Sequence, residues 1–430
     1  MLTLILYVLR AVAKALVEPM SLLVLILIGA MFYKQNKKIT LMQKIVVGKS
    51  INSPLELTIS QIVIGIFGAV LASLIIACLG ITFREDSLID FIFILSIIFM
   101  FIKPRFVCFA YSGAALGLLS FIFEKISIIL NKPSLDLFKI DIVALMSLVA
   151  VLHFVEGIMI ILDGKRGAIP VFKNDKGTIF GGFLLKRYWI LPVALLFIMN
   201  PNSFEGISIN FPNWWPIVKQ NIPFNTIKNL IISAITFYGI LGYESVTFTR
   251  SKEEKTVSSG IWVILYSIVL FLFSQVSSNN EFAQLLLIIF APLGHEAMIL
   301  IQRFMEIKGK AIYASGEEGI MVLEVIPNSL ADEMGIKSGD LLMNINNNKI
   351  NEENDILDVL RDAPNYIKLT ARKISGELKE LKYDNLVSKN DLGALMVPKV
   401  VPEDNAVIKL KGKEFKKYLD EAKKREEDNQ

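Results

Sequence analysis

The sequence predicts a polytopic α-helical membrane domain of about eight to nine spans, followed by a small soluble domain of short strands and helices. Apolar residues make up 53% of the 430 residues and the mean hydropathy is +0.53, which a soluble chain of this length would not tolerate. Long apolar runs recur from Met1 to about Arg303, and the proportion of charged residues then rises sharply. We therefore expect a membrane domain over residues 1–303, a soluble domain over 304–385 and a charged tail over 386–430.

Eight apolar runs approach the length of about 20 residues that a membrane-spanning helix needs. They lie at residues 62–81, 88–102, 106–123, 140–162, 188–199, 227–248, 261–275 and 282–301. The first 33 residues leave two alternatives open. They form one long span, or an amphipathic interfacial helix over 2–17 followed by a short span after Pro19, because proline interrupts a helix.

The distribution of lysine and arginine predicts the orientation of the chain, since short cytoplasmic loops are enriched in both. Four basic loops alternate with poorly basic ones; they lie at residues 34–49, 103–105, 165–187 and 250–255. A loop at 125–139 with three lysines is the exception. The heavy use of Ile, Lys and Asn fits an AT-rich bacterial genome, so we expect a multi-pass protein of the bacterial cell membrane with a cytoplasmic C-terminus. The basic loops predict attraction to anionic lipids, and nucleic acid is not expected as a partner.

The segment 319–347, GIMVLEVIPNSLADEMGIKSGDLLMNINN, is the most informative part of the soluble domain. It joins an apolar strand, a turn with a short helix, and a Gly-Ile-Lys-Ser-Gly-Asp turn before a second strand. Strands are expected at 311–313, 320–325, 341–345, 366–371 and 377–383, with a helix at 353–361. The segment resembles the core of a PDZ domain of the bacterial, protease-associated type. The resemblance implies a small barrel-like sheet with helices that docks peptides.

A PDZ domain binds a peptide as an extra strand beside its sheet, and a facing helix supplies side-chain pockets. Carried over to this sequence, the resemblance implies that the recognition strand and its loop comprise Gly319, Ile320, Met321, Val322 and Leu323. The groove helix would present Ile356, Val359 and Leu360. An alternative stays open: these apolar side chains belong partly to the core, because alternation along a strand buries every second one.

No catalytic site is predicted, although membrane spans with a PDZ-like domain raise the possibility of an intramembrane metalloprotease. That chemistry needs two histidines one helical turn apart with a glutamate between them, and a distant aspartate. Here His295-Glu296 is followed by Ile299 in place of the second histidine, and Asp163 precedes the pair, the reverse of the order in those proteases. Cys78 and Cys108 show no motif spacing. We therefore expect no enzymatic activity, no metal and no cofactor.

The chain has only two histidines, and both lie inside predicted spans. Glu156 follows His153 at i+3 on the same helix face, and Glu296 is adjacent to His295. Ionisable groups at membrane depth are costly, so they usually pair or line a polar cavity. We expect His153, Glu156, His295 and Glu296 to form an intramembrane polar cluster. Three interpretations remain open: a contact that holds two spans together, a metal or proton-linked site, or unrelated polar positions.

The whole arrangement of many spans, no catalytic set and one C-terminal soluble domain resembles the MinJ family, the topology proteins of Gram-positive cell division. The segment HFVEG at 153–157 and the basic loop GKRGAIPVF at 164–172 add to the resemblance. The resemblance implies a non-enzymatic scaffold or adaptor, enriched at septa and poles, that links a DivIVA-type coiled-coil protein to a MinD-type ATPase.

Two other functions remain as alternatives. A PDZ adaptor, or a catalytically inactive relative of an intramembrane protease, would deliver membrane substrates to a separate protease. A transporter that uses the His/Glu cluster is disfavoured, because the sequence shows no inverted repeat and no paired broken helices.

Overall fold

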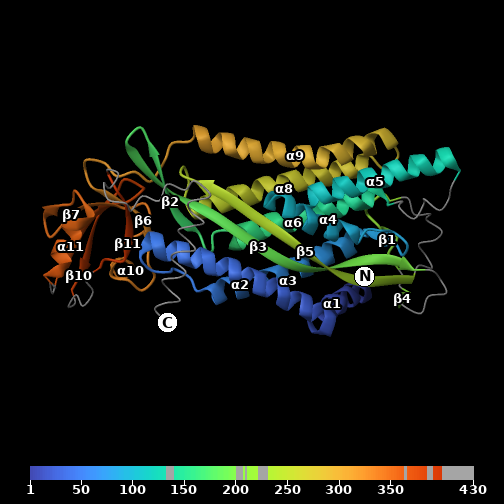
Figure 1. Cartoon of the computed structure of the whole chain (residues 1–430), viewed down its shortest axis with the longest axis horizontal. Helices are drawn as coiled ribbons and strands as arrows, with labels where there is room; N and C mark the ends of the chain where they lie inside the picture. Colours follow the sequence, from blue (N-terminus) through green and yellow to red (C-terminus); the bar gives the residue numbers. More distant parts are fainter. Residues whose placement is uncertain are drawn as a thin grey trace. The chain divides into compact units, whose positions relative to one another are not determined.

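The computed structural model describes residues 1–131, 140–199, 207–208, 211–220, 231–362, 366–384 and 391–399. It divides into two compact units, whose helices and strands are labelled in Figure 1. The larger unit is formed by Met1–Ile169 with Phe183–Lys310. The smaller is formed by Pro170–Gly182 with the C-terminal part from Ala311.

The larger unit is mainly helical. Its helices are α1 (Leu2–Val17), α2 (Pro19–Val47), α3 (Pro54–Leu79), α4 (Phe91–Ile102), the 3₁₀ turn η1 (Pro104–Val107), α5 (Phe109–Leu130), α6 (Ile142–Asp163), α8 (Lys252–Val276) and α9 (Glu281–Lys308). Six of the described helices, all but α1, α4 and η1, are long and apolar enough to cross a membrane. The expectation of eight to nine spans is therefore corrected to six helices of sufficient length in the described part of the chain.

The N-terminal segment follows the alternative with a break at Pro19. Glu18 is extended, with φ −67° and ψ 130°, and separates α1 from α2. The buried residues of α1 lie at helical spacing, at Leu4, Val8 and Val12. They pack against apolar side chains of the strands described next.

Two predicted spans, 188–199 and 227–248, are wrong, because their described parts are β-strands. β3 (Thr178–Met199) and β5 (Ile231–Thr247) pair antiparallel from Phe183↔Thr247 to Met199↔Ile231. Both are rich in β-branched and aromatic residues, which favour strands. Short strands extend this sheet: β1 (Thr82–Arg84) pairs with β3, and β4 (Ile207–Ser208) with β5.

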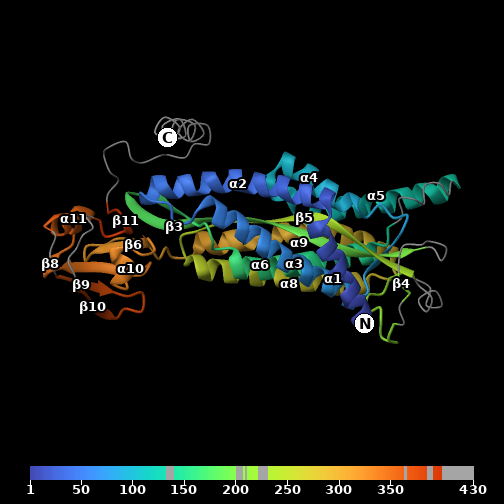
Figure 2. The same cartoon turned by 90° about the horizontal axis from the view of Figure 1, so that it is seen from below.

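Figures 1 and 2 both show the β3–β5 ribbon between α2 and α6. Most of β3 is buried, so its backbone polar groups need partners inside the protein. Pairing with β5 satisfies the backbone groups along one edge of β3. Ser73 of α3 also accepts the Ala194 N–H with its Oγ at 2.9 Å. At Gly65 an added Cβ would clash with the carbonyl of Ile190, so glycine lets α3 lie directly on β3.

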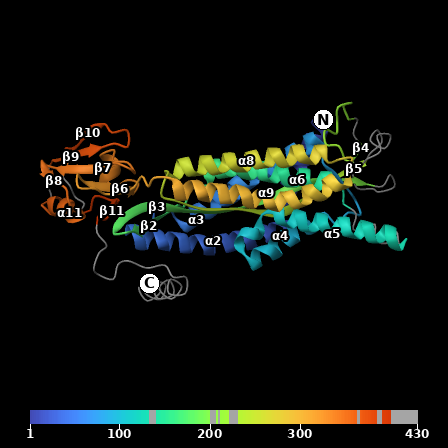
Figure 3. The ribbon, with the colours of Figure 1, turned by 90° about the horizontal axis from the view of Figure 1, so that it is seen from above.

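Helices α6 and α8 cross at a pair of glycines and run side by side (Figure 3). A Cβ added to Gly157 would lie 2.6 Å from Ile264 Cγ1 and 2.7 Å from the carbonyl oxygen of Gly260. A Cβ added to Gly260 would lie 2.5 Å from the carbonyl oxygen of Gly157. Small residues at such crossings let two apolar helices approach closely enough for extensive van der Waals contact.

A buried ion pair joins the C-terminal end of α6 to β3. Arg187, which is 0% exposed, donates to Asp163 Oδ2 from Nε at 3.0 Å and from Nη2 at 2.5 Å. Trp189 Nε1 donates to the same oxygen at 2.9 Å, and Arg187 Nη2 also reaches Ser60 Oγ of α3 at 2.7 Å. Every polar group of the pair therefore has a partner, which a buried charge requires.

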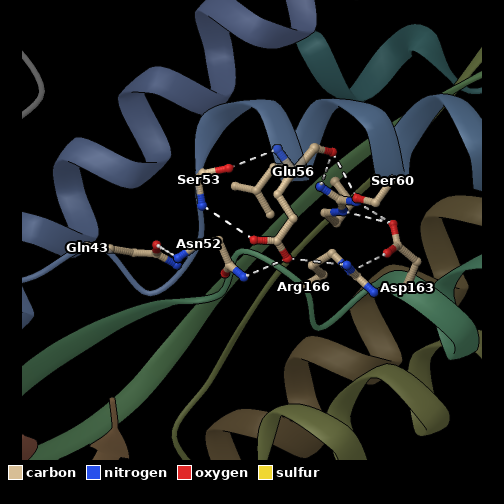
Figure 4. A network of polar contacts seen from close by, with 9 residues as sticks. Gln43, Asn52, Ser53, Glu56, Ser60, Asp163 and Arg166 are labelled. Atoms are coloured by element: carbon tan, nitrogen blue, oxygen red, sulfur yellow. Dashed lines mark hydrogen bonds and ion pairs between the residues drawn. The ribbon is translucent and has the colours of Figure 1, made fainter. Parts of the chain in front are cut away.

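Arg166 continues this network toward the surface, as Figure 4 shows. Its Nε lies 3.1 Å from Asp163 Oδ1, and its Nη1 lies 3.4 Å from Glu56 Oε1. Glu56 also completes a capping box with Ser53 at the start of α3. The basic loop of the sequence prediction is thus partly structural, because Arg187 is buried and Arg166 is paired.

The smaller unit is built on a sheet with strand order β10-β9-β7-β6-β11 and β8 beside β7. Its elements are β6 (Ile320–Val325), α10 (Leu330–Glu333), β7 (Leu341–Ile345), β8 (Asn348–Lys349), α11 (Glu353–Arg361), β9 (Ile367–Arg372), β10 (Leu378–Tyr383) and β11 (Ala394–Val397). Val322, Leu342, Leu360 and Leu369 belong to one buried apolar core. The expected strands and helix within 320–383 agree with these bounds to within one or two residues.

The smaller unit differs from the predicted bounds of 304–385: it starts at Ala311, includes the distant segment Pro170–Gly182 and continues past residue 385. A hairpin of β2 (Ile169–Asp175) and the start of β3 joins it, with the Gly181 N–H donating to the Tyr313 carbonyl at 2.9 Å. A Cβ at Gly181 would lie 2.9 Å from Leu323 and from Val397 side chains, so glycine permits this packing. β11 lies in the segment predicted as a tail. Residues 386–390 and 400–430 of that tail lie outside the described residues.

The α6–α8 crossing predicts that Gly157→Ala is destabilising. The added methyl overpacks against Ile264 and Gly260, at an expected cost of about 1–3 kcal/mol. Thermal unfolding of the purified protein in detergent measures the effect. Gly29→Ala in α2 is the matched control, because its nearest neighbour would be Ile62 Cδ1 at 3.4 Å and alanine favours helix. Equal melting temperatures for both variants would contradict the close crossing.

The buried ion pair predicts that substitutions of its two residues have strongly non-additive effects on the free energy of unfolding. Arg187→Met leaves the Asp163 carboxylate buried without its main partner and should cost about 3–5 kcal/mol. The double variant Asp163→Leu/Arg187→Met should be less destabilised than the sum of its single variants. Lys165 and Glu253 form an exposed ion pair. Replacing Lys165 should therefore change the free energy of unfolding by less than about 1 kcal/mol. Thermal unfolding of the four variants tests this, and simple additivity would refute it.

Candidate functional site

Cys108, His153 and His295 come together inside the helical unit from three different helices. Cys108 caps the N-terminus of α5, His153 lies in α6 and His295 in α9. Cys108 Sγ is 2.9 Å from His153 Nε2 and 3.5 Å from His295 Nε2. All three side chains are buried, with residue exposures of 7%, 1% and 8% in that order.

The tautomer of His153 follows from its second hydrogen bond. Its Nδ1 lies 2.7 Å from the carbonyl oxygen of Val149. A carbonyl oxygen only accepts, so Nδ1 carries the proton and donates it. The Nε2 lone pair of neutral His153 is then directed at the Cys108 sulfur. This arrangement is the one in which an imidazole ligates a metal or accepts a thiol proton.

Two polar atoms beside this cluster lack a hydrogen-bond partner in the described part of the chain: Glu156 Oε2 and His295 Nδ1. The Glu156 oxygen lies 4.0 Å from His153 Nε2, and its side chain is 8% exposed. The ring of Tyr266 stands edge-on to both imidazoles, with centroids 5.2 Å from His153 and 5.7 Å from His295. A carboxylate oxygen this deeply buried without a partner is costly.

The predicted polar cluster is divided by the structure. His153, His295 and Glu156 lie together, and the two imidazole centroids are 5.5 Å apart. Glu296 instead accepts hydrogen bonds from Arg105 and Tyr111. Asp163, considered as a distant metal ligand, is engaged by Arg187 and Trp189. Cys108 was set aside because it has no motif spacing, yet it is the centre of the cluster.

The cluster has the chemistry of a metal site more than that of a nucleophile. A thiol beside an imidazole resembles a catalytic Cys–His pair, but reactive cysteines sit in partly exposed, electropositive surroundings. Cys108 is buried among apolar helices, where a thiolate without a cation is strongly disfavoured.

The second candidate site is the edge of the C-terminal sheet, and here the predicted recognition strand is corrected. β6 pairs with β7 at Ile320 and Met321, and with β11 from Met321 to Val325. Both of its edges are occupied, so a peptide strand has no place to add beside Ile320–Leu323. Gly319, Ile320, Val322 and Leu323 are buried, and Met321 is partly buried.

The predicted helix residues divide between core and surface. Ile356 and Leu360 are buried in the core, whereas Val359 is partly exposed and packs against it. Asp355 fixes the start of α11: its carboxylate accepts the N–H of Glu352 at 2.9 Å and of Asn351 at 2.6 Å. These two hydrogen bonds lower the pKa of Asp355 because they favour the charged form.

The two end strands of the described sheet differ in charge. β10 carries Lys379, Glu380 and Lys382, the kind of residues that discourage further pairing at an edge. β11, with sequence ALMV, carries no charge. It follows a turn at Gly393, whose φ is +74° and whose carbonyl accepts the Ile326 N–H at 2.9 Å. β11 is therefore the end strand better suited to pair with another chain.

Comparison with known proteins identifies relatives of this chain. No protein-family model and no solved structure matches it. It is 24% identical over 265 residues to the cell division topological determinant MinJ of Bacillus subtilis (strain 168). It is 21% identical over 170 residues to the probable cell division topological determinants MinJ of Lacticaseibacillus paracasei and Lacticaseibacillus casei (strain BD-II).

These similarities cover only part of each protein. The first spans 58% of this chain and 62% of the Bacillus protein, and the others span 38% of this chain and 46% of the Lacticaseibacillus proteins. The chain thus spans less than two thirds of the length of the curated relatives it matches. The resemblance predicted from the sequence is confirmed at this level: the chain is similar to MinJ cell division topological determinants over part of their length.

Proposed function

We propose that this chain is a non-enzymatic membrane scaffold of bacterial cell division that recruits protein partners through its C-terminal sheet. Its relatives are named cell division topological determinants or probable ones, which supports a role in cell division. The six long apolar helices support a multi-pass membrane location. The uncharged end strand β11 is the observation that supports recruitment by strand addition.

The docking mode follows from that edge. In this proposal the C-terminal unit is PDZ-like, and a partner peptide adds beside β11. Main-chain hydrogen bonds to β11 supply affinity, and side chains between β11 and α11 supply selectivity. Ala394 of β11 and Val359 of α11 are both partly exposed and pack against one core, which fits such a groove.

The hairpin within the smaller unit supports a cytoplasmic location. The hairpin carries Lys173 and Lys176 and belongs to the same compact unit as the C-terminal strands. Membership of one unit supports locating the basic loop and the C-terminal sheet on one side of the membrane. Because lysine-rich loops favour the cytoplasmic side, we assign both to the cytoplasm, where anionic lipid headgroups attract them.

The partners proposed from the MinJ resemblance are a DivIVA-type coiled-coil protein and a MinD-type ATPase. Either would present an extended, uncharged segment or terminus to pair with β11. The alternative in which the same edge captures substrates for a separate protease makes a different prediction about location and crosslinked proteins.

The docking edge predicts that Leu395→Lys reduces partner capture. Leu395 is a partly exposed residue of β11. A lysine there introduces a charge of the kind that discourages strand pairing at exposed sheet edges. In living cells, the amount of the main partner that crosslinks to the full-length variant should fall by more than about tenfold, as expected when a binding hot spot is removed. Leu378→Lys on β10, where Leu378 is 62% exposed, is the matched control and should crosslink normally. Normal capture by the Leu395 variant would remove β11 from the proposal.

The division role predicts where the protein accumulates. A fluorescent fusion of the full-length chain in its native host should be enriched at septa and poles, and the Leu395→Lys fusion should remain in the membrane but lose that enrichment. Imaging of both fusions measures this. Uniform membrane signal, with a protease as the main crosslinked protein, would favour the substrate-delivery alternative.

A further inference from the structure

We propose that Cys108, His153, His295 and Glu156 form an intramembrane binding site for a borderline-soft divalent metal ion, of which Zn²⁺ best fits the ligand set. Thiolate, imidazole and carboxylate are the three side-chain ligands that zinc uses in proteins. The site is distinct from the docking edge and does not depend on the division role.

The spacing of the donor atoms suits a tetrahedral ion. The Cys108 sulfur and one nitrogen of each histidine all lie within 4.8 Å of one another. Zinc bonds of about 2.3 Å to sulfur and about 2.0–2.1 Å to nitrogen place these ligand atoms about 3.5 Å apart in a tetrahedron. The Cys108–His295 separation is already 3.5 Å, and the Cys108–His153 separation of 2.9 Å would open by about half an ångström.

Glu156 supplies the independent observation that points to a cation. Its Oε2 is buried, 4.0 Å from His153 Nε2, with no hydrogen-bond partner among the described residues. A contact that merely tied three helices together through the thiol and imidazoles would leave this oxygen unexplained. As a fourth ligand it would be satisfied, and the charges would balance. One thiolate and one carboxylate neutralise a divalent ion, which a low-dielectric interior requires.

His153 is preorganised for this role. Its Nδ1–H donates to the Val149 carbonyl, so Nε2 is fixed as the ligating atom, and such second-shell bonds orient metal-bound imidazoles in known sites. Because the ligands come from α5, α6 and α9, a bound ion would crosslink three helices. Metal binding would therefore stabilise the folded state as well as the site.

The test measures metal in the full-length protein, purified in detergent with any affinity tag removed. After zinc is supplied and free metal removed, wild-type protein should retain about one zinc per chain. Cys108→Ser and His295→Ala should lose it by more than about tenfold, whereas Glu156→Gln should weaken binding. Cys78→Ser is the matched control, because Cys78 is the only other cysteine and lies outside the cluster.

Cobalt substitution distinguishes a metal site from a thiol–imidazole contact that only holds the three helices together. Co²⁺ in the wild-type and Cys78→Ser proteins should give visible tetrahedral bands and a near-ultraviolet thiolate charge-transfer band, and the latter should be absent in Cys108→Ser. Zinc should raise the melting temperature of the wild type and leave that of Cys108→Ser unchanged. No zinc in the wild type, equal zinc in the Cys108 variant, or copper or iron in its place would overturn the assignment.

Discussion

The buried pairing of Asp163 with Arg187 is the constraint on which the larger unit depends. Two opposite charges removed from water are tolerated only when almost every donor and acceptor around them is satisfied. Here that condition fixes three elements at once: the last residue of α6, the middle of β3 and the first turns of α3. It also ties the ribbon to the helices at a defined register, because a one-residue slip would turn Arg187 to the opposite face.

Sequence reasoning located most of the helices but misread the ribbon. Hydropathy reflects burial, and β3 is a long, mostly buried and mostly apolar segment, as a membrane-spanning helix would be. Length did not distinguish the two, since β5 has 17 residues. The local signals that disfavour a helix, Pro192 and the glycines Gly239 and Gly242, were present in the sequence. They were outweighed by the assignment of every long apolar run to a membrane-spanning helix.

In the two candidate sites as well, local features were predictable from the sequence and long-range contacts were not. His153 and Glu156 were found because i+3 spacing on a helix is visible in one dimension. Cys108 was missed because its partners are 45 and 187 residues away, and ligands from three helices leave no local motif. The strand pattern of the C-terminal sheet was predictable, but which edge remains open was not. β11 closes β6 from a segment whose composition had suggested a tail.

The hairpin within the C-terminal unit bears on the order in which the protein is made. Its residues, Pro170–Gly182, leave the ribosome well before Tyr313 and Val397, the residues that Gly181 meets in the finished unit. The sheet can therefore close only after the intervening membrane helices α8 and α9 have been synthesised. A C-terminal fragment starting at Ala311 would lack one of its own packing elements. The smaller unit is thus completed only in chains whose preceding helices have already been translated.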